Sequence, residues 1–407
     1  MSRKEKEIKV PAEEQIRLEI PEDEIWTYKI EGLSAPRINQ TPKHYGLKKV
    51  IFVLTIVVAV SLSCIFSVLT LRKDTFEFEQ SQNGYAFTRF SNTGYITELE
   101  IDYVSDIEYE LGNPDPKTNF KVVKDESKPV TEVGSYVLNC DEKVKAITVG
   151  AGVEKIDSKA FYSCWALREI RVDKNNPNYC DIDGVLYNKD KTELICRPCD
   201  HDTYLAEKYG YAEFDDNGWR VEMSAEDPRY EQYVKDVMTF VVPSTVTTIG
   251  EMSFNYAHMK NVYLPEGLKT IETLGFFEIP LLENIYSYNT DYLVEDSHYV
   301  SDEALGTVYN SLPEGLEYIG SDAFSYNREL KYMYIPASVE YIGHNAFWDT
   351  VYKDGKELKG VVKMEVALSE EEFEQKVEAG NNWCPKYDYL LFKKSIDIIY
   401  NSNRAAK

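Results

Sequence analysis

A motif of thirteen residues occurs five times between residues 149 and 347, and this repetition constrains the fold more than any other feature of the chain. Each copy has an aliphatic residue, usually followed by Pro, then a second aliphatic residue four positions later and an Ile three positions after that. A small residue and a Phe follow the Ile at the fourth and fifth positions. Because all copies keep the same offsets, they are units of one repeated structure. The copies are VGAGVEKIDSKAF (149–161), VPSTVTTIGEMSF (242–254), LPEGLKTIETLGF (264–276), LPEGLEYIGSDAF (312–324) and IPASVEYIGHNAF (335–347).

The offsets predict a short strand and a bent return in each unit. Proline directly after the aliphatic residue removes a backbone donor and ends a strand. A second apolar set follows the Phe and ends with the alternation typical of a strand, as at Met259, Val262 and Leu264. Equivalent positions recur after 22 or 23 residues, as from 242 to 264 and from 312 to 335. Since one unit cannot bury its apolar side alone, the units are predicted to stack into an α/β solenoid.

The repeat resembles the BspA-type leucine-rich repeat, which is found on surface proteins of bacteria and some protists. The resemblance covers residues 138–352. Further family features are the segment FYSCWAL at 161–167 and the segment 178–198, which looks like the family's longer repeat with an added β-hairpin. The resemblance implies a leucine-rich-repeat ectodomain with short strands and bent returns, and a role in adhesion or host interaction at the bacterial surface.

Two stretches interrupt the repeat and are expected to be insertions, at 200–237 and 287–309. Ser287 and Asn310 also occupy positions that are aliphatic in the other copies. A fully regular horseshoe is therefore not expected.

The flanks of the repeat are expected to cover its two open ends. Residues 72–137 contain alternating strand-like runs with Gly and Asn-Pro breaks, which predict a β-rich spacer or N-terminal cap. At the other end, the run from Ser369 to Glu372 is typical of a capping box. A C-terminal cap over 353–407 is therefore expected, with a helix near 369–380.

Residues 50–71 form an apolar run of 22 residues without a charge. As a helix this run would extend about 33 Å, enough to cross the hydrocarbon core of a membrane. A buried core helix is the alternative, but such a helix normally has a polar stripe. We therefore predict one transmembrane helix at 50–71, preceded by a largely disordered cytoplasmic tail at 1–49.

The charge distribution suggests the orientation of this span. The chain has 407 residues, with 45 Lys and Arg against 69 Asp and Glu, for a formal net charge of −24. Residues 1–73 hold 12 basic and 9 acidic groups, which leaves 33 and 60 for residues 74–407, a net charge of −27. Slightly more basic residues precede the span than follow it, which favours a cytoplasmic N-terminus and an extracellular C-terminal domain. So acidic a domain is unsuited to neutralising phosphates, which excludes nucleic acid as a partner.

The Cys196-x-x-Cys199 pair has the spacing of a redox or zinc site, but lacks the further ligands that zinc requires. A disulfide is the preferred interpretation. If Lys189 and Asp190 form the tip of the predicted hairpin, Cys180 faces Cys199 across it. We therefore predict a Cys180–Cys199 disulfide, which an extracellular location would permit.

The sequence offers no pattern of catalytic residues. Its five His share no spacing that suggests a catalytic partner, and neither a phosphate-binding Gly loop nor a nucleophile elbow occurs. The segment 173–178 has alternate oxygen ligands but lacks the Gly and Glu of a calcium-binding loop. The chain is predicted not to be an enzyme, and no cofactor and no metal site are predicted.

Tyrosine provides the positive signal for function, since 29 of the 31 tyrosines follow the apolar run. Alternate residues of the repeat strands should point outward and align in two ladders across the sheet. One ladder reads Thr148, Arg171, Val241, Tyr263, Tyr286, Ser311 and Tyr334, and the other Ala146, Glu169, Thr239, Asn261, Asn284, Tyr309 and Tyr332. Tyrosine is favoured in binding surfaces, although aromatic residues also suit strands for structural reasons. The predicted ligand-binding face consists of Tyr263, Tyr286, Tyr309, Tyr332, Tyr334 and Arg171.

These features predict a membrane-anchored cell-surface protein that binds an extracellular protein or glycan ligand. Two other classes of function stay open. The ectodomain could act as a sensor or assembly subunit that signals to a cytosolic partner through residues 1–46. An envelope enzyme is the third class, with its chemistry in 200–237 or 72–137.

Overall fold

The computed structural model divides the chain into two compact units, Met1–Leu71 and Arg72–Lys407. The predicted span at 50–71 and the tail at 1–49 lie outside the described residues. Within the described part of the chain, no helix is both long and apolar enough to cross a membrane. The structure describes residues 75–91, 95–109, 120–138, 140–216, 220–289, 302–347, 352–354, 357–359, 363–378 and 397–404.

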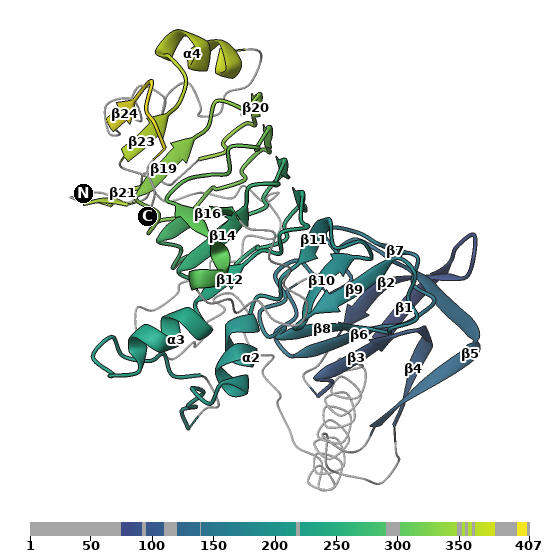
Figure 1. Cartoon of the computed structure of the whole chain (residues 1–407). Coiled ribbons are helices and arrows are strands. Elements are labelled where there is room, and N and C mark those ends of the chain that lie inside the picture. Colours follow the sequence, from purple (N-terminus) through teal and green to yellow (C-terminus); the bar gives the residue numbers. More distant parts are fainter. Residues whose placement is uncertain are drawn as a thin grey trace, which may run out of the picture. The chain divides into compact units, whose positions relative to one another are not determined.

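A mixed sheet, with both antiparallel and parallel strand pairs, precedes the repeats. Its strands lie in the order β1 (Thr75–Gln80), β2 (Tyr85–Ser91), β5 (Phe120–Val133) and β4 (Tyr103–Tyr109), as Figure 1 shows. A register shift between β1 and β2 brings Phe76 and Phe78 opposite Phe90 and Phe87, and the four rings pack with centroids 4.9–6.3 Å apart. Because β5 also pairs with β7 (Lys155–Ile156), this sheet continues directly into the first repeat.

The first strand of the repeat sheet lies before residue 138, where the sequence places the start of the repeats. β3 (Glu98–Ile101) pairs in parallel with β6 (Ala146–Val149), which pairs in parallel with β8 (Glu169–Val172). Leu99, Ile147 and Ile170 share one register position and are buried. The region 72–137 therefore contains a repeat strand as well as the preceding sheet.

Each later copy of the motif contributes a short strand inside its return, as well as the longer strand before it. The longer strands form the order β12 (Thr239–Val241), β14 (Asn261–Pro265), β16 (Asn284–Asn289) and β17 (Thr307–Tyr309). The return strands pair in parallel in the order β13 (Thr248–Ile249), β15 (Thr270–Ile271), β18 (Tyr318–Ile319) and β20 (Tyr341–Ile342). The predicted bent return is therefore itself hydrogen-bonded from one copy to the next.

The Ile and Phe of the motif form the core of the repeats. The four return-strand isoleucines are at most 2% exposed. The rings of Phe254, Phe276, Phe324 and Phe347 stack in order, with centroids 4.7, 5.4 and 5.6 Å apart and planes within 14° of parallel. These two motif positions therefore point inward, and the phenylalanines form a continuous column.

The return bends at the third residue after the motif Ile, where the backbone is left-handed. Met252, Leu274, Asp322 and Asn345 occupy this position with φ between 53° and 59°. Residues other than Gly and Asn seldom adopt this backbone conformation. Hydrogen bonds between copies offset the strain, because Met252, Leu274 and Asp322 donate their backbone N–H to the next copy at 2.8–3.1 Å.

A hairpin and a pair of helices separate the first copy of the motif from the others. β9 (Tyr179–Ile182), β10 (Val185–Asn188) and β11 (Glu193–Cys196) form an antiparallel meander, and β11 then pairs in parallel with β13. The insertion that follows contains α2 (His201–Lys208) and α3 (Tyr230–Asp236). These helices pack around a small apolar cluster that includes Leu205, Tyr233 and Met238.

The C-terminal part begins a separate sheet. β19 (Tyr332–Ile335) pairs with β23 (Lys363–Val366), which pairs with β24 (Asp397–Ile399). α4 (Glu370–Glu378) begins at the predicted capping box, since the Ser369 N–H donates to Glu372 Oε2 at 3.0 Å and the Glu372 N–H to Ser369 Oγ at 3.3 Å. The remaining elements are η1 (Asp302–Leu305) and the hairpin of β21 (Tyr352–Asp354) and β22 (Glu357–Lys359).

Candidate ligand-binding surface

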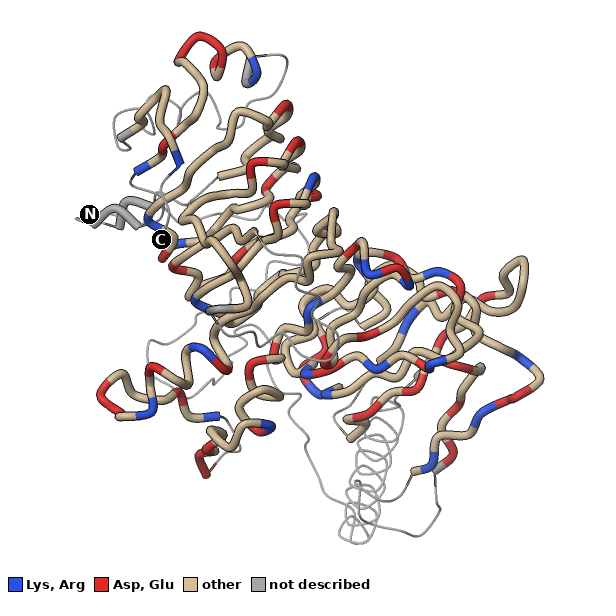
Figure 2. Tube along the Cα trace, in the orientation of Figure 1, with Lys and Arg blue, Asp and Glu red and all other residues tan. Residues whose placement is uncertain are grey.

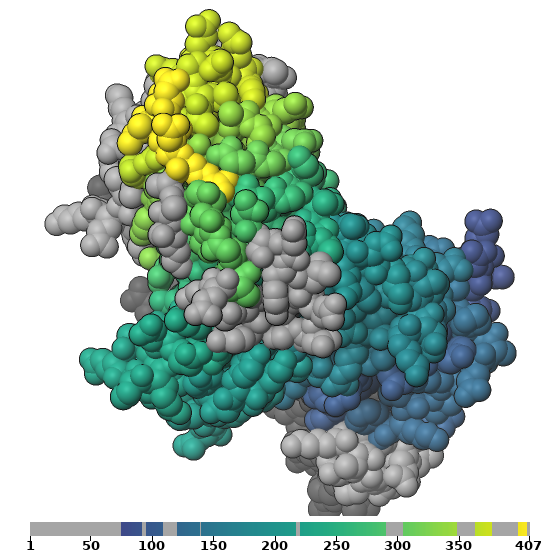
Figure 3. All heavy atoms as spheres, in the orientation of Figure 1, coloured from purple at the N-terminus to yellow at the C-terminus, as the bar shows by residue number. Residues whose placement is uncertain are grey.

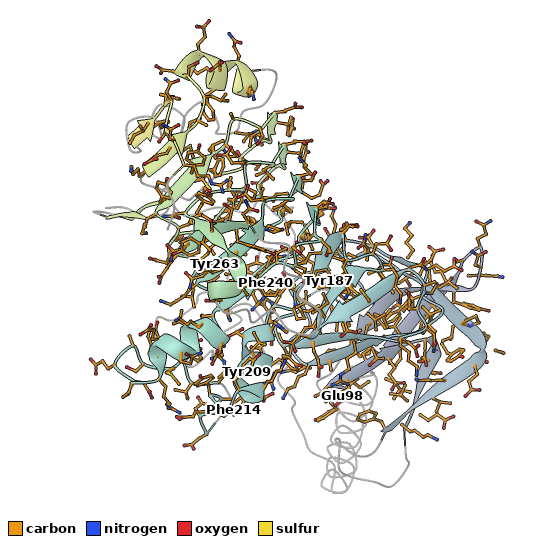
Figure 4. All side chains as sticks on the ribbon, in the orientation of Figure 1. Glu98, Tyr187, Tyr209, Phe214, Phe240 and Tyr263 are labelled. Atoms are coloured by element: carbon orange, nitrogen blue, oxygen red, sulfur yellow. The ribbon has the colours of Figure 1, made fainter. Side chains whose placement is uncertain are left out.

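Three strands align the outward residues as the repeat predicts. Val241, Tyr263 and Tyr286 share one register position of β12, β14 and β16, and Thr239, Asn261 and Asn284 share another. The rings of Tyr263 and Tyr286 lie 4.9 Å apart, and Figure 4 labels Tyr263 on the repeat strands.

The polar residues of these strands are linked by hydrogen bonds. Asn284 Nδ2 donates to Asn261 Oδ1 at 2.9 Å, and Asn261 Nδ2 donates to Thr239 Oγ1 at 3.1 Å. These three half-buried residues, which we call the polar ladder, form one fixed row of amide and hydroxyl groups.

The predicted ladder of five tyrosines does not form. β17 runs antiparallel to β16, so Tyr309 lies opposite Ser287 and does not continue the register of Asn284. Tyr332 and Tyr334 lie on β19, which pairs with β23 and not with β17. The insertion after β16 explains why the ladder ends there. The strand that follows the insertion, β17, runs in the opposite direction and so ends the run of parallel strands.

The burial of the predicted tyrosines also differs from an open binding face. Tyr263 is 6% exposed and Tyr334 is 3% exposed, whereas Tyr286, Tyr309 and Tyr332 are half-buried. Burial together with Glu365 raises the pKa of Tyr332, whose ring lies 5.5 Å from Lys363 Nζ. Two of the five tyrosines are therefore packing residues.

Arg171 lies on β8, in the separate sheet of β3, β6 and β8. Its exposed guanidinium forms an ion pair with Glu169 two residues earlier. No strand pairing among the described residues joins this sheet to β12, so Arg171 is not in register with the tyrosines of β14 and β16.

The predicted Cys180–Cys199 disulfide is wrong, because both thiols are free. Cys180 lies on β9 opposite Tyr187 and donates to the carbonyl of Asn188 at 3.3 Å, whereas Cys199 follows β11 and donates to the carbonyl of Asn255 at 3.3 Å. The chain turns at Asp183 and Gly184 as well as after β10, so Cys180 lies on a third strand, β9, and the assumed tip at 189–190 does not determine its partner.

A pocket lies where the α2–α3 insertion meets the repeat strands. It has a volume of about 400 Å³ and is bordered by the residues directly before the polar ladder, including Met238 and Lys260. The insertion contributes Tyr230 and Tyr233, and Lys260 Nζ lies 5.7 Å from the centroid of the Tyr230 ring. The full lining is Glu222, Met223, Tyr230, Tyr233, Met238, His258, Lys260, Pro280 and Leu281.

A charged cluster centred on Asp202 lies next to this pocket. Asp202 is fully buried and forms an ion pair with Arg220, whose Nη1 donates to the Tyr233 hydroxyl at 2.8 Å. His258 Nδ1 lies 3.7 Å from Asp202 Oδ1, a charge contact that is longer than a hydrogen bond. This carboxylate raises the pKa of His258, and burial opposes the effect only in part.

Two further groups fix the cluster in place. The fully buried Arg197 lies with its guanidinium 5.7 Å from the Phe240 ring and donates to the carbonyl of His258 at 3.4 Å. Burial and then Asp202 raise the pKa of Asp200 to about 6, although Arg168 Nε contacts the same carboxylate at 3.1 Å. Figure 2 shows charges of both signs along the insertion.

The arrangement is suited to holding a polar ligand with an apolar or ring-shaped face. Tyrosine and methionine side chains provide contact area, and His258 and Lys260 provide donors at the rim. Within the described ranges, no group of three or more His, Cys, Asp or Glu side chains is placed to bind a metal ion.

Sequence reasoning did not identify the residues of this pocket. His258 lies inside a repeat, and Asp202 and Arg220 are 18 positions apart in the first insertion, so no periodic pattern connects them. The one available signal was the insertion itself, because it interrupts the repeat directly before the strand that begins at Thr239.

Comparison with known proteins agrees with the repeat. Residues 117–181 and 229–352 match the BspA type leucine-rich repeat region, with six copies. Comparison with curated protein sequences gives no significant match.

Several solved structures are similar to the chain at low identity. A leucine-rich repeat protein from Eubacterium ventriosum is 18% identical with a TM-score of 0.39, over 58% of this chain and 52% of that one. The pneumococcal vaccine antigen PcpA is 18% identical with a TM-score of 0.36, over 69% and 64%. A leucine-rich cell surface protein from Faecalibacterium prausnitzii is 14% identical with a TM-score of 0.26, over 82% and 94%. The chain thus spans about half the length of the first of these proteins and less than two thirds of the second. Residues 117–181 and 229–352 of the chain are therefore BspA-type leucine-rich repeats.

Proposed function

We propose that the protein is a membrane-anchored, non-enzymatic surface receptor that binds a protein or glycan ligand outside the cell. The pocket between the α2–α3 insertion and the repeat strands is the single observation that carries this proposal. It joins aromatic surface and cationic donors, and two residues of the polar ladder, Thr239 and Asn261, directly follow Met238 and Lys260 of its lining.

A glycan suits this surface better than a flat protein epitope. The ring of Tyr230 offers an apolar face on which the C–H groups of a sugar can stack. Outside the pocket lining, the amides of the polar ladder can exchange hydrogen bonds with hydroxyls of a ligand that extends along the strands. His258 and Lys260 would favour a sugar that carries an acidic group.

The membrane anchor in this proposal rests on the sequence. The apolar run at 50–71 would hold the repeats at the surface, and the net charge of −27 over residues 74–407 suits an external, soluble domain. The neighbouring structures include one described as a cell surface protein, which is consistent with such a location.

The test compares binding by the full chain and two tyrosine variants on an array of cell-wall and host glycans. Tyr230→Ala removes the ring beside Lys260, and a loss of about tenfold in affinity is expected from the lost aromatic contact. Tyr341→Ala is the matched control, because Tyr341 is also half-buried and stacks on another ring, that of Tyr318 at 4.7 Å, but lies in the return sheet. Equal binding by wild type and Tyr230→Ala would refute the assignment of the pocket.

A further inference from the structure

The last described residues of the chain lie across the later repeats. After β24, the backbone N–H of Asn401 donates to the carbonyl of Leu368 and that of Ser402 to the carbonyl of Val366, both at 3.0 Å. The carbonyl of Ser402 lies 3.5 Å from the hydroxyl of Tyr334. Figure 3 shows these C-terminal residues, in yellow, against the green surface of the repeats. This segment therefore covers the one tyrosine of the predicted face that is most deeply buried.

Arg404, at the end of this segment, is held in a cradle of two carboxylates and one ring. Its guanidinium carbon lies 3.4 Å from the centroid of the Tyr309 ring, and Nη2 lies 2.6 Å from Glu266 Oε1. Nη1 lies 3.9 Å from Glu314 Oε1. The Arg404 side chain is only 10% exposed, so a positive charge near the end of the chain is almost fully enclosed.

The cradle is built by the repeats and not by the C-terminal segment. Glu266 and Glu314 follow the Pro of two copies of the motif, where the other two Pro-containing copies have Ser244 and Ala337. The backbone N–H of Glu314 donates to Glu266 Oε2 at 3.0 Å, which fixes the two acidic residues relative to each other. Because β15 and β18 pair directly, these residues come from adjacent copies.

The contact with Arg404 leaves hydrogen-bonding capacity unused. Among the described residues, neither Arg404 Nε nor Glu266 Oε1 forms an aligned hydrogen bond, so the 2.6 Å contact is an ion pair of imperfect geometry. An arginine presented with better geometry would satisfy both groups, and a buried unsatisfied donor or acceptor is costly.

We propose that Glu266, Glu314 and Tyr309 form a recognition site for an arginine side chain of a partner protein, and that Arg404 occupies this site until the partner displaces it. The site is specific for guanidinium, because a planar cation can stack on the ring and pair with a carboxylate at the same time. This proposal concerns the end of β14, whereas the glycan pocket lies at its start, so the two proposals stand or fall independently.

The test measures binding of two synthetic peptides by calorimetry. One has the sequence of residues 401–407, and the other has alanine in place of the arginine. A chain that ends at Tyr400 has an empty cradle and should bind the arginine peptide at least about tenfold more tightly than the alanine peptide. The full-length chain should bind the arginine peptide about tenfold more weakly than the shortened chain, because Arg404 competes. Adding Glu266→Gln to the shortened chain should abolish the preference for arginine.

Three results would overturn the proposal. The first is equal binding of both peptides by the shortened chain, and the second is binding by the full-length chain as tight as that by the shortened one. The third is a dimer that light scattering detects for the wild-type chain but not for the shortened chain. In that case, Arg404 of a second copy would occupy the site. If the shortened chain does not fold, the full-length Arg404→Ala variant replaces it, and ethylguanidinium serves as the probe. Ethylguanidinium should then raise the unfolding temperature of this variant. No rise in the unfolding temperature would count against the site. If these variants still bind glycan, a failure of the arginine site leaves the proposal for the glycan pocket unaffected.

Discussion

At the scale of single residues, the buried carboxylate of Asp202 controls the charge beside the pocket. It pairs with Arg220, which also holds the hydroxyl of Tyr233, and it lies 3.7 Å from His258. A fully buried carboxylate is costly unless it is paired, so Asp202 requires its cationic neighbours. The pocket therefore has a second positive charge beside that of Lys260 only while His258 is protonated.

This cluster predicts a pH dependence that His258 carries. The pKa of His258 is raised above its ordinary value near 6.5, so its pairing with Asp202 stabilises the fold fully below pH 6.5 and is lost as pH rises through the raised pKa. His258→Asn should lower the free energy of unfolding at pH 6 by at most about 1 kcal/mol, since the imidazole is partly exposed, and should have little effect at pH 9. Urea unfolding of both proteins at the two pH values measures the difference. An equal loss at both pH values would contradict the ion pair.

The cysteines give a second prediction at this scale. Burial raises the pKa of Cys199 to about 12 and raises that of Cys164 well above its ordinary value, whereas Cys140 is exposed. Since the thiolate is the reactive form, iodoacetamide should label Cys140 first in the folded chain and should label Cys164 and Cys199 only after unfolding. Mass spectrometry of peptides from the labelled chain measures the order. Failure of Cys180 and Cys199 to react after unfolding without reductant would show that they are oxidised.

At the scale of strands and returns, the repeat predicted the register wherever consecutive copies pair directly. Val241, Tyr263 and Tyr286 align as their offsets require, because the spacing of 22 or 23 residues fixes one turn of the repeat. The prediction failed at Tyr309, because it assumed that the strand after the insertion runs in the same direction. The direction of a returning strand depends on tertiary contacts that no short-range pattern records. The same limit applies to the hairpin, where a second turn at Asp183 and Gly184 places Cys180 on β9, which β10 separates from β11.

The glycine after the motif Ile gives a prediction for the returns. A Cβ on Gly320 would overlap the backbone of Glu272 and Thr273 in the preceding copy, because the return strands approach closely there. Gly320→Ala should therefore lower the free energy of unfolding by about 1–3 kcal/mol. Gly267→Ala is the control, since its Cβ would come no closer than 3.9 Å to Ser244 O, and it should be neutral or stabilise the chain by up to about 1 kcal/mol. Thermal unfolding of both variants decides the matter, and equal effects would contradict the close approach.

At the scale of the whole chain, the two proposed sites lie at opposite ends of the same strand. The glycan pocket borders Lys260 directly before β14, and the arginine cradle includes Glu266 directly after it. The sequence predicted that this sheet would carry the binding function. It did not predict that an insertion would build the pocket, or that the C-terminal segment would enclose Glu266. Both features join residues that are far apart in sequence and belong to no repeat.

Hydrogen exchange of the full chain, measured by mass spectrometry with and without an acidic glycan fragment that it binds, tests the central claim most directly. Binding in the pocket should slow backbone exchange in α3 and in the segment from His258 to Tyr263, because the ligand contacts both sides of the junction. Exchange in β3, β6 and β8 should be unchanged. Slower exchange confined to β3, β6 and β8, with none in α3, would contradict the account.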